Sequence, residues 1–498
     1  MDNDAQTGTG VVTTETERKY RVPAGVEVPD LASIGPIGVP RIDTLVATYY
    51  DTPDFALLAA RATLRRRTGG QDAGWHLKTP GTGDVRGEHR LPLEVGRRVP
   101  FAFRAEFAEV LEEKPLLPIV ELTTVRTTTE HFDDEGRVRA EICSDRVSAV
   151  VLRRDVDLDL DWHEVEIELP AGEPIATFGL IEPVLTEAGI ERTDAPSKLA
   201  HILATVPPTP AVDLDDAAAD AVVSIMARHF GKLQSLEGDL IANAPDAVHQ
   251  SRVALRRMRS LVQGYRRVFD RQDAVRLRGE LRWAGEQLGE ARDAEVLVEK
   301  FAELFDACAE GEIVGAIRER VEGSLGRRHA QALTHLRRVV ASPRWDALHL
   351  LASEFILDSP TSRRGRRPAF GVLPKLAADT IDLVRERTDA ARADETNLDA
   401  WHEVRKGAKR VRYSYEVLEQ LGDEDAKPTR QAWKEVAEDF GAVQDAVILD
   451  EQLQRFERAA TAAGEPIDTY ELLRGRFETD RDAELARVRT LLDELLAE

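Results

Sequence analysis

Charged residues alternate along strand-like segments in the N-terminal part of the chain. Glu15, Glu17 and Lys19 stand at every second position near the N-terminus, and Glu164 and Glu166 repeat this spacing much later. Because successive side chains of a β-strand point to opposite faces, each segment places its charges on one face. Such a face either meets solvent or lines the interior of a closed sheet, where it would form a site for a metal ion and phosphate.

Basic segments lie between these two acidic ones. Arg65 and Arg67 would share a strand face, and a turn at residues 68–70 would join their strand to a second one that carries Lys78. Burying ions without partners costs several kcal/mol each, so a closed cavity with both kinds of strand requires water, a metal ion and a polyanion. The ionic residues assigned to this cavity are Glu15, Glu17, Asp145, Glu164 and Glu166, with Lys19, Arg65, Arg67, Lys78, Arg126 and Lys198.

The composition limits the classes of protein to which the chain can belong. At 498 residues it is long for one hydrophobic core, so we expect two or three domains. The net charge of −23 argues against general nucleic-acid binding, which depends on neutralising phosphates. Two cysteines, Cys143 and Cys308, form no metal or disulfide pattern. The chain has no long apolar run and no signal-like start, so we expect a cytoplasmic protein without a membrane partner.

The sequence changes character at a proline-rich stretch, residues 206–210, which is stiff and continues neither a helix nor a strand. Before it, β-branched runs and short turns predominate; after it, Ala, Leu, Arg and Glu recur at helical spacing. A second break at residues 359–368 divides the helical part. The expected organisation is a β domain at 1–205, a linker at 206–216 and an all-helical domain at 217–498 with repeats at about 217–358 and 369–498.

The helical part repeats a pattern of one histidine followed by basic residues at offsets of three, seven, eight and ten. Offsets zero, three, seven and ten lie within about 80° of a helix surface, so each copy presents a narrow basic stripe. Two facing stripes would form a basic groove. Its residues are His249, Arg252, Arg256, Arg257 and Arg259 in the first copy and His402, Arg405, Lys409, Arg410 and Arg412 in the second.

This repetition points to a duplication. Asp293 and Asp445 follow the histidines by 44 and 43 residues, and we expect them to orient the basic helices. Arginines on exposed helices often pair with nearby acids, but residues 247–269 contain none. The two histidines alone are equally well explained as buried structural residues.

The N-terminal motifs, in order, resemble the CYTH domain of the triphosphate tunnel metalloenzymes, whose hallmark is Glu-x-Glu-x-Lys. The matching pieces run from residue 10 to about 205: Glu15-x-Glu17-x-Lys19, Tyr49-Tyr50-Asp51-Thr52, Leu64-Arg65-Arg66-Arg67, Leu77-Lys78, Arg126, Asp145, Glu164-Val165-Glu166 and Ala195-Pro196-Ser197-Lys198. An exposed sheet edge would explain the first motif alone, but not this ordered series. His76 and Thr79 depart from the family pattern beside Lys78, and the resemblance assigns no roles to Arg86, Glu88 and Arg90.

The resemblance implies an eight-stranded antiparallel β-tunnel. The five carboxylates assigned above would hold a divalent metal, Mg²⁺ or Mn²⁺. The six cations would grip the oxygens of a triphosphate, and the catalytic set would be Glu15, Glu17, Lys19, Arg65, Arg67, Lys78, Arg126 and Lys198.

The helical part resembles the CHAD domain, a duplicated helical domain that is commonly found after a CYTH domain and is associated with inorganic polyphosphate. Lys409 replaces an arginine of the first copy, which keeps the charge but loses the bidentate fork. The fold class expected for the whole chain is α+β multidomain, with a β-tunnel followed by a duplicated helical bundle.

The two resemblances together imply metal-dependent hydrolysis of inorganic triphosphate or a related triphosphate, with polyphosphate as a second partner and an association with polyphosphate granules. Two alternatives stay open: a polyphosphate-binding protein without activity, and an organic triphosphatase or adenylate cyclase built on the same tunnel. All the residues expected of a metal site are present, which favours an enzyme, and no sequence feature selects a nucleobase.

Overall fold

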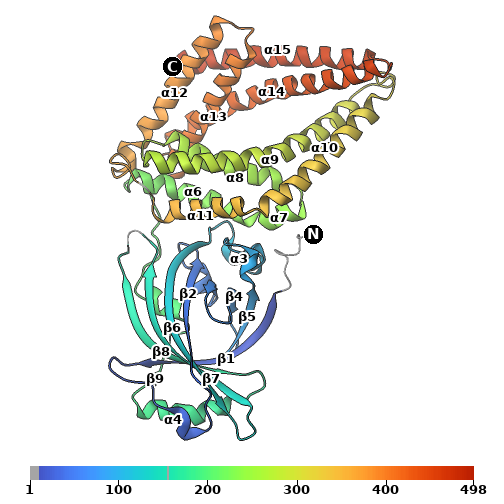
Figure 1. The fold of residues 1–498 in the computed structure, drawn as a ribbon. Helices are drawn as coiled ribbons and strands as arrows, with labels where there is room; N and C mark the ends of the chain where they lie inside the picture. Colours follow the sequence, from blue (N-terminus) through green and yellow to red (C-terminus); the bar gives the residue numbers. More distant parts are fainter. Residues whose placement is uncertain (1–9, 154–155, 194, 360, 498) are drawn as a thin grey trace. The chain divides into compact units, whose positions relative to one another are not determined.

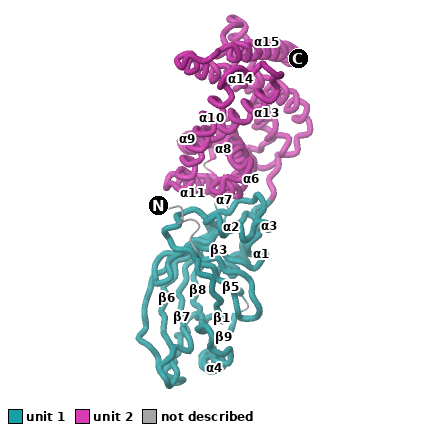
Figure 2. The backbone as a smooth tube through the Cα atoms, turned by 90° about the vertical axis from the view of Figure 1, so that its right-hand side faces the viewer, with its two compact units in different colours: residues 1–210 teal, residues 211–498 magenta. Residues whose placement is uncertain are grey.

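The computed structural model describes residues 10–153, 156–193, 195–359 and 361–497. The chain forms two compact units, Met1–Pro210 and Ala211–Glu498 (Figure 2). The change from strands to helices that the sequence predicts near the proline-rich stretch coincides with this division. None of the described helices combines the length and apolarity that crossing a membrane requires.

The first unit is a closed antiparallel barrel, as predicted (Figure 1). Its eight strands follow the order β5-β4-β3-β2-β6-β7-β8-β1, and pairing of β1 with β5 closes the sheet. The short strand β9 (Glu191–Arg192) adds to β1. The barrel strands are β1 (Val11–Val22), β2 (Arg41–Asp51), β3 (Thr63–Thr68), β4 (Gly74–Thr79), β5 (Val85–Leu91), β6 (Leu117–Phe132), β7 (Val138–Val151) and β8 (Asp159–Leu169).

Apolar residues on the outside of the barrel pack against short helices. Val165 and Ile167 of β8 are buried against Phe178, Ile181 and Leu185 of α4. Burying each such side chain contributes roughly 1.5–3 kcal/mol, so this outer layer fixes which face of the strand points inward. The helices of this unit are α1 (Ala56–Ala59), α2 (Phe101–Glu106), α3 (Ala108–Leu111), α4 (Phe178–Glu187) and α5 (Lys198–Leu203).

The second unit is helical, and its two halves each carry one basic stripe. The stripes lie on α8 and α13, and a long helix follows each of them, α9 and α14. The helices are α6 (Ala218–Ser235), α7 (Glu237–Ala242), α8 (Ala247–Gly264), α9 (Arg271–Asp306), α10 (Ile317–Val340), α11 (Pro343–Leu357), α12 (Leu373–Ala393), α13 (Leu398–Gln420), α14 (Ala426–Ala462) and α15 (Asp468–Ala497).

The loop between α11 and α12 is tied to the rest of the helical unit through its backbone. The amide of Ala219 donates to the carbonyl of Gly365 at 3.0 Å, and the amide of Ala218 donates to that of Arg367 at 2.9 Å. Thr361 forms a β-bridge with Phe269. The arginine-rich break therefore lies against the start of α6 and the region after α8, while Pro360 falls outside the described residues.

Candidate active site and helical basic cluster

The alternating charges of the barrel strands point into its interior. Nine of the eleven predicted cavity residues line the pocket there: Glu15, Glu17, Lys19, Arg65, Arg67, Lys78, Arg126, Glu166 and Lys198. The other two, Asp145 and Glu164, both contact Lys198. The structure thus brings all eleven residues together in and around one interior pocket.

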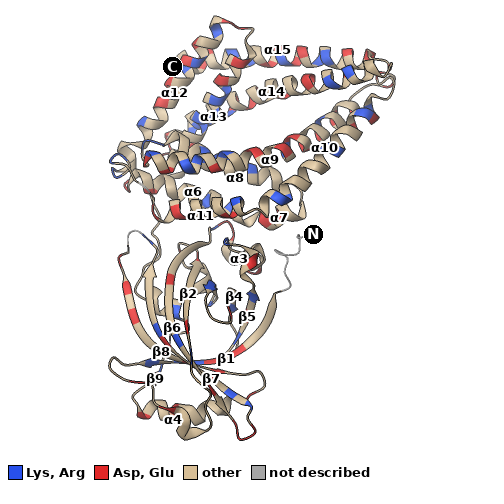
Figure 3. Ribbon diagram, viewed as in Figure 1, with Lys and Arg blue, Asp and Glu red and all other residues tan. Residues whose placement is uncertain are grey.

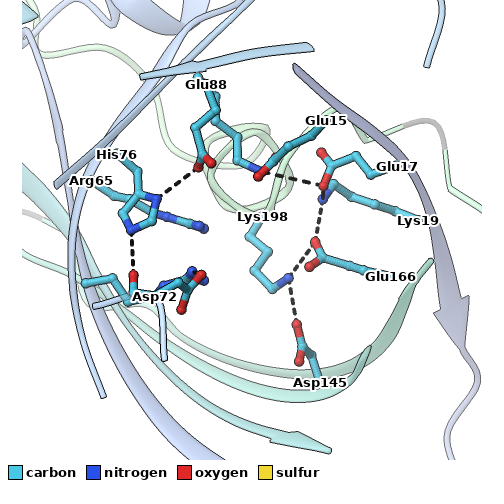
Figure 4. Close-up of polar contacts among 12 residues, drawn as sticks. Glu15, Glu17, Lys19, Arg65, Asp72, His76, Glu88, Asp145, Glu166 and Lys198 are labelled. Atoms are coloured by element: carbon cyan, nitrogen blue, oxygen red, sulfur yellow. Dashed lines mark hydrogen bonds and ion pairs between the residues drawn. The ribbon is translucent and has the colours of Figure 1, made fainter. Parts of the chain in front are cut away.

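Lys198 lies at the centre of the acidic residues (Figure 4). Its Nζ is 2.9 Å from Oδ2 of Asp145, 2.6 Å from Oε1 of Glu164 and 2.8 Å from Oε1 of Glu166. It is the first residue of α5, which Ser197 caps by accepting a hydrogen bond from the amide of Ala200 at 3.1 Å. Burial opposes its charge, but the three carboxylates raise the pKa of Lys198 well above its ordinary value.

Arg126 joins the acidic residues of neighbouring strands. Its Nε and Nη2 donate to both carboxylate oxygens of Asp145 at 2.8 and 2.7 Å, and Nη2 also donates to Glu166 at 2.5 Å. The strand register explains the first contact, because Arg126 of β6 is directly opposite Asp145 of β7. Asp145 is fully buried, so its charge depends on this bidentate pair and on Lys198.

The alternation of β1 places Glu17 between two lysines. Its Oε2 is 3.1 Å from Nζ of Lys19 and 3.5 Å from Nζ of Lys78. Burial alone would raise the pKa of Glu17, but these two ammonium groups lower it to about 2. Glu15 pairs with Lys78 and, at 2.7 Å, with Arg90.

Arg65 and Arg67 stand on the wall formed by β3. The Nη1 of Arg65 donates to the hydroxyl of Tyr49 at 3.3 Å, and Arg67 pairs with Asp72 of the β3–β4 turn. The Nε atoms of both arginines are buried, and the described residues offer them no hydrogen-bond acceptor. Burial, together with repulsion from Arg65 and Arg126, lowers the pKa of Arg67 to about 9. This wall would therefore be stabilised by an added anion.

The carboxylates form two triads that fit a divalent metal. The first contains Glu17, Glu166 and Glu168, and the second Asp145, Glu164 and Glu166; in each, ligand oxygens lie within 4.8 Å of one another. Hard oxygen donors at such spacing suit Mg²⁺ or Mn²⁺. Glu168 is absent from the predicted set although it continues the alternation of Glu164 and Glu166. Glu15 was predicted as a ligand and lies in neither triad.

Other polar residues of the barrel hold the β3–β4–β5 region in place. The ring nitrogens of His76 lie 2.9 Å from Oε1 of Glu88 and 2.9 Å from the backbone oxygen of Asp72. Arg90 pairs with Glu88, which is almost fully buried. Sequence reasoning missed these roles, and it also left unassigned several residues that line the pocket: Tyr49, Thr63, Asp72, Arg86, Arg90, Glu168 and Ser197.

The motif residue Asp51 serves the fold. Its carboxylate accepts hydrogen bonds from the amides of Thr52 at 2.7 Å, Leu57 at 2.8 Å and Leu58 at 2.9 Å. It thereby caps the turn that leads into α1. Burial is the main reason that the pKa of Asp51 rises to about 6, against these hydrogen bonds.

In the helical unit, Lys and Arg residues recur along α8 and α13 (Figure 3), and the two stripes lie close together. The Nε of Arg256 donates to the hydroxyl of Tyr413 at 3.0 Å. Burial and repulsion from arginines of both helices lower the pKa of Lys409 to about 7. We call these residues the helical basic cluster: Arg252, Arg256 and Arg259 with Arg405, Lys409 and Arg412.

The acids predicted to orient the basic helices lie beside them. Oδ1 of Asp293 is 2.5 Å from Nη1 of Arg252, and the charge of Asp445 acts on Arg405. Arg257 and Arg410, which follow the two histidines by eight residues, lie at the margin of the stripes. Arg257 pairs with Glu416, and the charges of Arg266 and Arg387 act on Arg410.

The predicted histidines have different surroundings. Gln444 and Lys406 lie near His402, and burial lowers the pKa of its imidazole. Its Nδ1 is buried and has no hydrogen-bond partner among the residues that the structure describes. His249 is half-buried on α8, at the N-terminal end of the stripe.

Comparison with known proteins identifies both units. The CYTH domain family matches residues 13–203 and the CHAD domain family matches residues 224–454. The uncharacterized protein Rv2226 of Mycobacterium tuberculosis is 32% identical over 490 residues, which span 92% of each chain. Human thiamine-triphosphatase is 43% identical over 75 residues, 15% of this chain and 30% of that protein.

Among solved structures, the CHAD domain from the plant Ricinus communis covers 57% of this chain and 94% of its own, with a TM-score of 0.45 and 22% identity. Three findings point to the same family. They are the barrel with its inward-facing charges, the paired basic helices, and the match along nearly the whole length of a relative. The chain belongs to the family of proteins in which a CYTH domain is followed by a CHAD domain.

Proposed function

We propose that the tunnel hydrolyses a phosphoanhydride bond of inorganic triphosphate or a related triphosphate with the help of Mg²⁺ or Mn²⁺, and that the helical basic cluster binds inorganic polyphosphate. The observation that carries the first part is the arrangement of Arg65 and Arg67 opposite the two carboxylate triads. On one wall the Nε atoms of both arginines have no acceptor among the described residues, and the other wall is suited to a cation. A metal–triphosphate complex would complement both walls.

The side chains of the tunnel would act by position and charge. Phosphoryl transfer needs little covalent help, and its main requirement is stabilisation of charge on the phosphate oxygens. Arg65, Arg67 and Arg126 would bind these oxygens bidentately, and Lys19 and Lys78 would bind them as point charges. The triads would hold the metal, which supplies charge neutralisation and an activated water.

Existing ion pairs would exchange during binding. Arg67 would leave Asp72, and Lys198 would leave at least one of its three carboxylates, because each group would gain a phosphate oxygen or a metal in return. Glu17 is ionised before binding, as its low pKa indicates. Human thiamine-triphosphatase shares 43% identity over a short segment, which supports a triphosphate substrate in general.

The test is phosphate release by the full chain from inorganic triphosphate, nucleoside triphosphates, thiamine triphosphate and long polyphosphate, each with Mg²⁺, with Mn²⁺ and with a chelator. Metal-dependent release from a triphosphate supports the proposal. If no substrate is hydrolysed but triphosphate still binds, the tunnel is a binding module. Binding of long polyphosphate in the presence of the chelator tests the helical part separately.

A further inference from the structure

A cleft in the helical unit has a charged lining made only of arginines. It lies beside the end of α8, the start of α9 and the loop between α11 and α12, and its volume is about 740 Å³. We call it the arginine cleft; its lining residues are Arg266, Arg267, Arg271, Arg278 and Arg364 with Val262, Phe269, Ala274 and Val275. In a chain with a net charge of −23, this concentration of positive charge calls for an explanation.

Most of these arginines have no acidic partner in the part of the chain that the structure describes. Arg267 pairs with Asp379 at 2.8 Å. Within the described ranges, no carboxylate oxygen is found within 4.0 Å of Arg266, Arg271, Arg278 or Arg364. Arg364 belongs to the arginine-rich break, whose backbone is fixed by the hydrogen bonds from Ala218 and Ala219. The guanidinium groups therefore converge on one cleft from three segments that the fold holds together.

The arginines of the cleft begin beyond the end of α8, the helix that carries the first basic stripe. Arg252, Arg256 and Arg259 lie on one face of α8, and Arg266 follows two residues after Gly264, the last residue of that helix. The charge of Arg266 acts on Arg410 of α13, so the cleft and the stripes are electrostatically connected. From His249 to Gly264, where α8 ends, the helix rises about 23 Å.

We propose that the arginine cleft is a second phosphate-binding subsite, which holds the part of a long polyphosphate chain that extends beyond the helical basic cluster. This inference rests on polyphosphate binding by that cluster. A repeating inorganic anion fits because guanidinium groups bind phosphate oxygens bidentately and the lining has no acid to repel them. The helical unit would then distinguish long chains, which reach both subsites, from short ones.

The experiment compares the full chain with the triple variant R271Q, R278Q and R364Q. These residues are exposed or half-buried, so neutralising them leaves the core unchanged. Binding is measured with a chelator present, using long polyphosphate and chains shorter than about 23 Å. We expect the variant to bind the long chains about tenfold more weakly and the short chains as well as the parent does. For the long chains, the slope of the logarithm of the binding constant against the logarithm of the salt concentration should fall in magnitude by about two.

A matched control is available in another basic cleft of the same unit. Arg327, Arg328 and Arg455 line it between α10 and α14, together with Glu319. Neutralising these three exposed arginines removes the same charge away from the α8 stripe, and long-chain binding should stay near that of the parent. Equal losses in both triple variants, or no loss in the cleft variant, would overturn the inference.

The outcome separates this inference from the proposed function. If the parent chain does not bind long polyphosphate at low salt, the proposed role of the helical basic cluster fails and the subsite fails with it. If the parent binds and the cleft variant binds equally well, only the subsite is wrong.

Discussion

Nζ of Lys198 lies 2.9 Å from Oδ2 of Asp145, inside the triad that also contains Glu164 and Glu166. An ammonium group and a divalent metal cannot share this position, so the lysine must compete with the metal for the carboxylates. We expect Lys198→Ala to lower turnover at least tenfold, because a phosphate contact is lost. The same change should lower the metal concentration that gives half-maximal activity.

The metal titration separates this role from a purely structural one. A variant that was merely misfolded would lose activity without binding metal more tightly, and a calorimetric titration with Mn²⁺ measures that binding without turnover. Weaker metal binding by the Lys198 variant would show that Lys198 supports the metal site and does not compete with it.

Removing the carboxylate shared by both triads should abolish metal-dependent hydrolysis. Glu166→Gln keeps the side-chain volume but removes a charged oxygen ligand. It also leaves Lys19, Arg126 and Lys198 with fewer acidic partners, so we expect the free energy of unfolding to fall by about 3 kcal/mol. Glu121→Gln on the exposed side of β6 is the control. Turnover by the Glu166 variant at saturating metal would contradict this assignment.

The alternation of β3 allows an unusually direct test. Arg65 and Arg67 point into the tunnel, whereas Arg66 is opposite Trp75, whose ring packs in the outer core. Arg65→Ala and Arg67→Ala should each raise the KM for triphosphate roughly ten- to a hundredfold, since a charge-assisted hydrogen bond contributes roughly 1.5–3 kcal/mol. Arg66→Ala should leave KM unchanged. A similar rise of KM in all three variants would mean that binding depends on the net charge of the strand and not on which side chains point into the tunnel.

Strand alternation predicted most of the tunnel because the side-chain period of a strand is fixed. The same alternation extends to Glu168, two residues after Glu166, although the predicted metal site does not include this residue. The contact between Arg126 and Asp145 depends on the register of β6 and β7, which spacing alone does not determine.

Helical spacing had a similar limit in the second unit. It predicted that the stripes on α8 and α13 could face each other, but it could not show that Arg257 pairs with Glu416 of the other helix. The break at residues 359–368 could be predicted only as a loop. Its contribution to the arginine cleft depends on backbone hydrogen bonds to Ala218 and Ala219, which link segments far apart in the sequence.

Polyphosphate binding by the helical basic cluster should weaken as the pH rises above about 7. Lys409 has its pKa lowered to about 7 by burial and by repulsion from Arg405, Arg256, Arg412 and Arg252, with Asp445 as the nearby acid. A bound phosphate would offset this repulsion and raise the pKa again. Binding between pH 7 and the raised pKa would therefore take up a proton, and affinity would fall by up to about tenfold per pH unit.

The variant Lys409→Arg provides the control, because arginine stays charged and matches Arg256 in the first copy. Calorimetry in buffers of different ionisation enthalpy measures the proton uptake, and the titrating ends of the ligand contribute equally with both proteins. The parent should take up more protons than the variant and lose affinity more steeply above pH 7. The effect of Lys409 on folding has the opposite pH dependence, because the unfolded chain binds the Lys409 proton more tightly than the folded chain does. This residue therefore makes the free energy of unfolding rise with pH from about 7 to 10.5. Equal proton uptake by parent and variant would show that Lys409 is already charged before phosphate binds.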